Sequence, residues 1–133
     1  MGARDELASL YASETSDDIR EAIIEGLFVA GDAARISQLA QSEKDPDLRA
    51  EAIQKLGLMG SKTAPLLLQL YNSESDKVKE AVIEALFLQN NARALIDMSK
   101  KEKNRELRND MIEKLSVMRN PEAVNYMLEI LNQ

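Results

Sequence analysis

Apolar residues recur along the chain at the spacing that one face of an α-helix requires. Four segments each place apolar side chains at positions i, i+4, i+5 and i+8, and their first members, here called the anchors, are Ile19, Leu48, Val78 and Leu107. This spacing follows the 3.6-residue period of the helix, so each segment predicts an amphipathic helix. The anchors are separated by 29, 30 and 29 residues, a fixed period that indicates a solenoid of stacked helical units.

Start and stop signals delimit each expected helix. Three residues before the anchors stand four residues whose side chains can cap a helix N-terminus: Ser16, Asp45, Ser75 and Asn104. The same helices are expected to end at 30–32, 59–61, 89–91 and 119–121, where glycine or asparagine offers a left-handed C-terminal cap. A second apolar pattern begins 17 residues after each anchor, so every unit predicts two helices joined by a turn. The chain is therefore expected to be all-α, with four units at about 16–44, 45–74, 75–103 and 104–133.

Residues 1–15 predict a leader followed by an incomplete unit. Leu7, Leu10 and Tyr11 have the spacing of the second helix of a unit, while its first helix is missing. One unit alone buries too little apolar surface to offset the conformational entropy of ordering it, so we expect all units to fold as one cooperative domain. The helices at both ends lack a neighbour, so we expect the chain to be a segment of a longer solenoid; the alternative is that the first helix is a cap without a polar outer face. Open ends of this kind also predict end-to-end self-association.

A basic residue follows each anchor, in "DDIREAI", "DPDLRAEAI", "DKVKEAV" and "RELRNDM". Together with the capped start and the Gly or Asn turn, this pattern resembles the HEAT repeat in its short bacterial, PBS-lyase-like form. The resemblance covers about residues 16–133. It implies a right-handed α-solenoid whose second helices line the concave side, and it implies a protein-binding scaffold.

The composition excludes several kinds of chemistry. The chain has no cysteine and no histidine, which removes disulfides, thiolate nucleophiles, Ser-His-Asp catalysis and imidazole metal ligands. Carboxylates are abundant, but no glycine-rich phosphate loop and no metal-ligand spacing accompanies them. We therefore expect no enzyme activity and no cofactor. The longest apolar run, 64–71, is too short to span a membrane, and nothing in the sequence specifies a compartment.

The outward positions of the expected second helices are the candidate partner-binding positions. They fall 19 and 22 residues after the anchors and hold Gln38, Leu67, Asp97 and Tyr126, then Gln41, Leu70, Lys100 and Glu129. Only the second unit has apolar residues at both positions, and its segment 65–71 is hydrophobic on almost every face of the expected helix. The hypothesis is that Leu67, Leu70 and Tyr71 form an apolar patch for a protein or peptide, with Asp97, Lys100 and Tyr126 on the same side. The alternative is that superhelical curvature or neighbouring helices cover these residues.

Charge bears on a second class of partner. A net charge of −6 repels phosphate backbones, which disfavours nucleic-acid binding. Against this acidic background, the segment 100–108 contains Lys100, Lys101, Lys103, Arg105 and Arg108. An alternative function is therefore a nucleic-acid-binding array that uses this cluster, while a solvated loop and helix start explains the same residues without any ligand.

Overall fold

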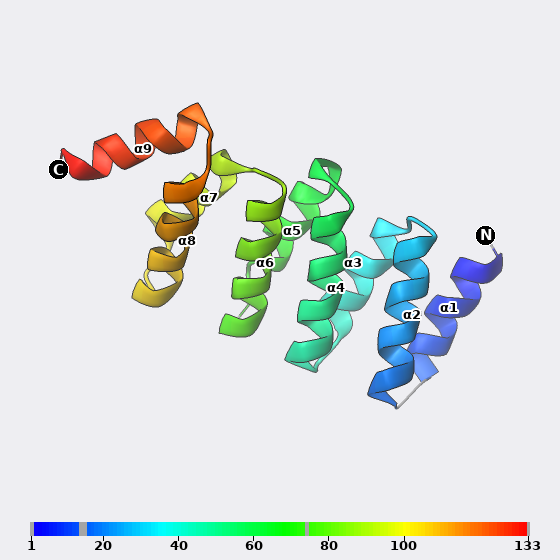
Figure 1. Ribbon diagram of the computed structural model, residues 1–133. Coiled ribbons are helices and arrows are strands. Elements are labelled where there is room, and N and C mark those ends of the chain that lie inside the picture. Colours follow the sequence, from blue (N-terminus) through cyan, green and yellow to red (C-terminus); the bar gives the residue numbers. More distant parts are fainter. Residues whose placement is uncertain (1, 14–15, 74, 133) are drawn as a thin grey trace.

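The computed structural model describes residues 2–13, 16–73 and 75–132, and it is built of helices without strands in this part of the chain (Figure 1). Met1, part of the expected leader, and residues 14–15 lie outside the described residues. The helices are α1 (Gly2–Ser13), α2 (Asp17–Val29), α3 (Ala33–Ser42), α4 (Pro46–Leu58), the 3-10 turn η1 (Ser61–Thr63), α5 (Ala64–Leu70), α6 (Asp76–Leu88), α7 (Ala92–Lys101), α8 (Arg105–Val117) and α9 (Pro121–Leu131). The predicted all-α solenoid is confirmed, while its handedness stays a prediction.

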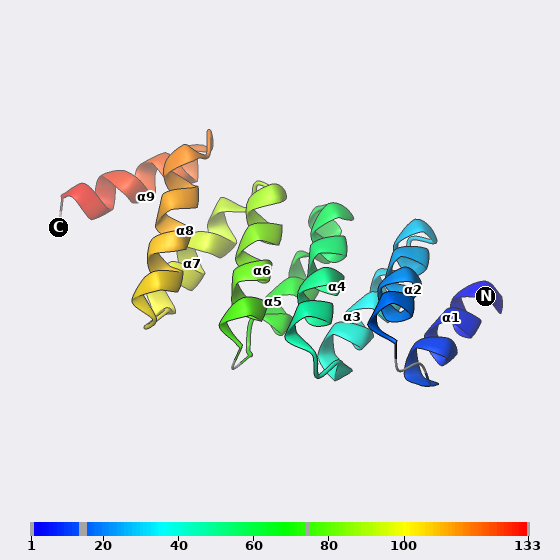
Figure 2. The ribbon, with the colours of Figure 1, turned by 60° about the horizontal axis from the view of Figure 1, so that its bottom comes forward.

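The helices form two rows that run from one end of the molecule to the other (Figures 1 and 2). The A row consists of α2, α4, α6 and α8 side by side, and the B row of α1, α3, α5 and α7 lies behind it. Helix α9 packs against α7 and α8 and projects at the C-terminal end (Figure 1). The termini therefore lie at opposite ends of the array. The division into a half unit and four repeats that unfold together stays a prediction.

The caps that begin and end the A-row helices largely follow the sequence signals. Asp45, Ser75 and Asn104 accept hydrogen bonds from backbone N–H groups in the first turns of α4, α6 and α8. Left-handed backbone conformations occur after α2, α4 and α6, at Gly31, Gly60 and Asn90. The turn after α8 differs, because Met118 at its C-cap is extended and no left-handed residue follows it among those described.

The core lies between the two rows and contains most of the predicted positions. Leu48, Val78 and Leu107 are buried, as are the apolar residues that follow them on the same helix faces, except Ile112, which is half-buried. Ile19 is the exception among the anchors, since it is 47% exposed. Helix α2 is the first helix of the A row, so Ile19 lacks the preceding A-row neighbour that its three equivalents have.

Helix α5 departs from the regular pattern of the second helices. This departure changes which residues of the predicted apolar patch are exposed. Helices α3, α7 and α9 begin 14 residues after their anchors, whereas η1 delays the start of α5 to 16 residues. Two extra residues rotate the helix face by about 200°, at about 100° per residue. Leu67 and Leu70 are consequently 0% and 3% exposed and belong to the core, while Leu68 is 40% exposed. The prediction that Leu67 and Leu70 point outward is wrong.

Candidate partner-binding hollow

A hollow of about 690 Å³ lies where the C-terminal ends of α5 and α7 meet the first turn of α6. We name it the Tyr71 hollow. Its lining residues are Leu68, Tyr71, Asn72, Ser73, Lys79, Met98, Lys101, Glu102 and Lys103. It therefore combines apolar surface with charged groups at the edge of the B row where second helices end.

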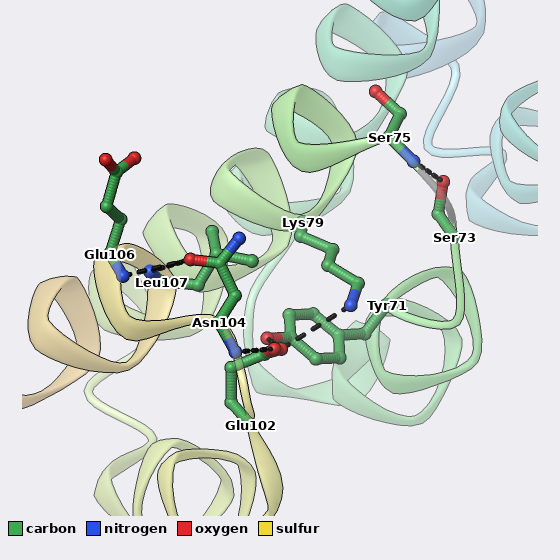
Figure 3. Close-up of polar contacts among 8 residues, drawn as sticks. All are labelled: Tyr71, Ser73, Ser75, Lys79, Glu102, Asn104, Glu106 and Leu107. Atoms are coloured by element: carbon green, nitrogen blue, oxygen red, sulfur yellow. Dashed lines mark hydrogen bonds and ion pairs between the residues drawn. The ribbon is translucent and has the colours of Figure 1, made fainter.

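A polar cluster at its base joins three elements (Figure 3). The Tyr71 hydroxyl, at the end of α5, donates a hydrogen bond to the Glu102 carboxylate after α7. The Lys79 Nζ on α6 lies 3.5 Å from Glu102 Oε1 and 5.1 Å from the centre of the Tyr71 ring. The other carboxylate oxygen, Oε2, accepts a hydrogen bond from the Asn104 backbone N–H at 3.0 Å. Each polar group of the cluster thus has a partner, which fixes the geometry of the hollow.

The protonation states of Glu102 and Tyr71 do not change near neutral pH. Burial is the strongest influence on Glu102 and opposes its ionisation, but the hydrogen bonds from Tyr71 and Asn104 and the charge of Lys79 together lower its pKa below the ordinary value. Burial, followed by the hydrogen bond to Glu102, raises the pKa of Tyr71. The pair therefore remains a carboxylate and a neutral phenol, so it acts as a structural support and not as an acid–base pair.

The same cluster occurs a second time, two units earlier in the chain. The Tyr11 hydroxyl donates to the Glu43 carboxylate, whose Oε1 lies 3.4 Å from Arg20 Nη1. Glu43 Oε2 accepts from the Asp45 backbone N–H at 2.9 Å, and the Arg20 guanidinium lies 5.3 Å from the Tyr11 ring centre. A smaller hollow of about 380 Å³ surrounds this cluster. Glu43 and Glu102 are separated by 59 residues, so the two clusters lie two units apart in the chain.

The unit between them is built differently. Arg49 occupies the position of Arg20 and Lys79 after its anchor, but its Nε donates to the Ala40 carbonyl at 2.8 Å. Its Nη1 lies 3.4 Å from Ser73 Oγ, where a glutamate would stand in the other units. The sequence signal for this alternation was present, since tyrosine and glutamate recur two units apart. The 29-residue period does not contain this signal, because the recurrence spans two units.

The six candidate residues do not form one patch. Leu67 and Leu70 lie in the core, and only Tyr71 lines the Tyr71 hollow. Asp97 and Lys100 are exposed on α7 and line a separate hollow of about 190 Å³ near Glu122. Tyr126 on α9 is half-buried, with its hydroxyl 2.9 Å from Ser99 Oγ and its ring centre 5.4 Å from Lys100 Nζ. Partner binding at Tyr71, Asp97, Lys100 and Tyr126 stays a prediction.

The charge around the Tyr71 hollow differs from that of the whole protein. Lys101 and Lys103 are exposed at its rim and form no ion pair with any described residue. The lining holds three amines against the single carboxylate of Glu102, and the negative charge of Asp76 lies close enough to add slightly to the raised pKa of Tyr71. The hollow is therefore locally positive on a chain whose net charge is −6.

Within the described ranges, no group of three or more carboxylates is arranged to hold a metal ion. None of the helices formed by these residues has the length and apolar character that crossing a membrane requires.

Comparison with known proteins identifies the repeat type. A family model described as HEAT repeats matches residues 33–113, which is more than half of the chain. HEAT repeats generally serve as protein-interaction scaffolds and are typically non-catalytic. A search of curated proteins finds no match.

Proposed function

Because the chain belongs to the HEAT repeat family, we propose that it is a non-catalytic scaffold that binds a segment of another protein. The common use of HEAT repeats supports this proposal. So does the composition, since a chain without histidine and cysteine lacks the usual nucleophile and general-base pairs. The function therefore depends on a contact surface and not on a reaction centre.

The contact surface that we propose is the Tyr71 hollow, and its partner is an acidic peptide segment. The observation that carries this proposal is the pair of exposed amines, Lys101 and Lys103, beside the apolar side chains of Leu68 and Met98. An acidic segment with interspersed apolar residues matches both features, because opposite charge favours encounter and apolar contact adds affinity. The fixed cluster of Tyr71, Lys79 and Glu102 keeps this surface preformed, which reduces the entropic cost of binding.

A nucleic acid is the second candidate, since Lys101 and Lys103 belong to the cluster 100–108. Arg105 and Arg108 are also exposed. The net charge of −6 and the apolar part of the hollow favour the peptide, because phosphate binding is mainly electrostatic. The two candidates differ in one respect: binding of the peptide depends on the apolar side chains of that peptide, whereas binding of a nucleic acid does not.

Fluorescence anisotropy with labelled probes tests the proposal. The probes are a peptide of alternating glutamate and leucine, the same peptide with glutamine in place of glutamate, and single-stranded oligothymidine. The variant Lys101→Glu/Lys103→Glu reverses the charge of the rim, and Lys62→Glu on η1 is the control because Lys62 is exposed outside the hollow. We expect the double variant to weaken acidic-peptide binding about tenfold, or about 1.4 kcal/mol, and the control to leave it unchanged.

Two outcomes contradict this proposal. Equal affinity of the wild type and the double variant for the acidic peptide would remove the Tyr71 hollow as the contact surface. Tighter binding of oligothymidine than of the peptide at physiological salt would favour the nucleic-acid function.

A further inference from the structure

The last residue of every A-row helix is a large apolar residue that lies mostly in solvent. These residues are Val29, Leu58, Leu88 and Val117, and they are between 52% and 78% exposed. Each follows its anchor by ten residues, so the four occupy one equivalent position of the repeat. We call them the apolar ladder.

The apolar ladder does not contribute to the core between the rows. Ten residues after the anchor correspond to a rotation of about 280°, whereas the buried positions of the same helices lie between about −20° at Ala85 and about 180° at Gly57. The ladder side chains therefore point away from the B row. Exposed apolar residues are ordinary when they are scattered, but here the same exposed position is apolar in all four units, so the feature repeats along one surface.

The four side chains form a row because the A-row helices are closely packed. All four helices end at the same edge of the array, the upper edge in Figure 1. Helix α4 packs against α2 and α6, and α6 packs against α8. A Cβ atom on Gly57 would lie 2.7 Å from the Cβ of Ala85, so α4 and α6 approach closely near this edge. Packed helices lie about 8–10 Å apart, which places successive ladder residues on the order of 10 Å apart.

An acidic hollow continues the ladder along the outer face of α4 and α6. It has a volume of about 610 Å³, and Leu88 of the ladder is part of its lining. Its other lining residues are Glu21, Asp47, Ala50, Glu51, Gln54, Lys77, Ala81, Glu84 and Ala85. Four carboxylates thus face one amine, and that amine, Lys77, is paired with Asp47.

The other lysines beside this face are also paired. Lys55 binds Glu25 and Glu51, with its Nζ 2.7 Å from Glu25 Oε2 and 3.6 Å from Glu51 Oε1. Lys114 binds Glu84 at 3.3 Å and Asp110 at 2.7 Å. These lysines are therefore already neutralised by carboxylates, and a cationic ligand meets net negative charge on this face.

We propose that the apolar ladder and the acidic hollow bind a basic amphipathic helix of a partner protein, which lies across the A-row helices. An α-helix rises 1.5 Å per residue, so a step on the order of 10 Å corresponds to about seven residues and to two complete turns. A partner helix with an apolar residue at every seventh position therefore places these residues on one face, and that face can contact successive ladder residues. An amphipathic helix with one apolar stripe therefore fits this surface.

This contact surface is separate from the Tyr71 hollow. Figure 1 shows the loops that precede α4, α6 and α8 at the edge opposite to the ladder, and the Tyr71 hollow includes residues of two of these loops. The two surfaces also have opposite charge and thus select different partners.

Anisotropy with a labelled helical peptide tests the inference on the full chain. The peptide has about 25 residues, with leucine at every seventh position and lysine or arginine on the flanks. A second peptide has the same composition but leucine at every sixth position. The protein variant Leu58→Ser/Leu88→Ser removes the two central ladder residues, and Leu128→Ser/Leu131→Ser removes two exposed leucines of α9 as a matched control. Circular dichroism melting checks that both variants remain folded.

We expect the ladder variant to lose at least tenfold in affinity, the control to change less than twofold, and the respaced peptide to bind at least tenfold more weakly. Equal losses in both variants, or equal binding of both peptides, would show unspecific charge attraction and overturn the inference. Light scattering adds a further test: self-association that the ladder variant abolishes would assign the ladder to a second copy of this chain instead. The variant Lys101→Glu/Lys103→Glu should leave this binding unchanged, which separates the result from that on the Tyr71 hollow.

Discussion

Replacing Leu67 with alanine tests whether α5 is rotated relative to the other second helices, α3, α7 and α9. The Leu67 side chain is completely buried, whereas its neighbour Leu68 is 40% exposed. If α5 followed the register of the other second helices, Leu68 would lie in the core and Leu67 would point outward. The two alanine variants therefore distinguish the two registers by the order of their stabilities.

The magnitude follows from burial. Leucine to alanine removes about three carbon groups at about 0.8 kcal/mol each, or about 2.4 kcal/mol for a fully buried side chain. The cavity that remains adds to this cost, so Leu67→Ala should lower the free energy of unfolding by about 3 kcal/mol. At about 2.1 cal/mol/K per residue, this corresponds to a decrease in Tm of about 11 °C for a chain of this length. Leu68→Ala removes a partly solvated side chain and should cost about 1 kcal/mol or less.

Urea unfolding followed by far-ultraviolet circular dichroism measures both variants. The slope of the free energy with urea should not change, because neither substitution alters the surface exposed on unfolding very much. A cost for Leu68→Ala equal to or greater than that for Leu67→Ala would refute the rotation of α5.

Two further predictions concern pH and the turn before α5. Glu43 and Glu102 have lowered pKa values in the folded protein, so the stability that they contribute is present above their unfolded pKa of 4.5 and is lost as pH falls through the lower folded pKa values. Tm measured at decreasing acidic pH should therefore drop in that range, and Glu102→Gln should reduce the drop. If the variant shows the same drop in Tm as the wild type, Glu102 does not cause it. Gly60 has φ +95°, a conformation that side chains with a Cβ rarely adopt, so Gly60→Ala should lower stability by about 1–3 kcal/mol in urea unfolding, while the exposed neighbour Ser61→Ala should change it little.

The parts of the fold that depend on neighbouring residues in sequence could be predicted. The caps at Asp45, Ser75 and Asn104 use backbone N–H groups two or three residues away, so each signal is complete within one turn. The apolar positions of the A-row helices are likewise defined by the 3.6-residue period alone. Ile19 was misplaced because its burial depends on a neighbouring helix, which no local pattern describes.

The candidate site was predicted only in part, and the reason is geometric. Tyr71 was identified, but its partners Lys79 and Glu102 are 8 and 31 residues away, and their meeting depends on how two units stack. Leu67 was assigned to the surface because the pattern assumed turns of equal length. Two additional residues in one turn changed which face of α5 meets the core.

The sequence by itself determined the helices, their period and the exclusion of histidine and cysteine chemistry, because composition and the rotation per residue are properties of the chain alone. Tertiary structure decided which face of each helix is buried, which charges meet across units, and that four apolar helix ends form one row. These features depend on the relative rotation and spacing of packed helices, which turn length and side-chain contacts determine together.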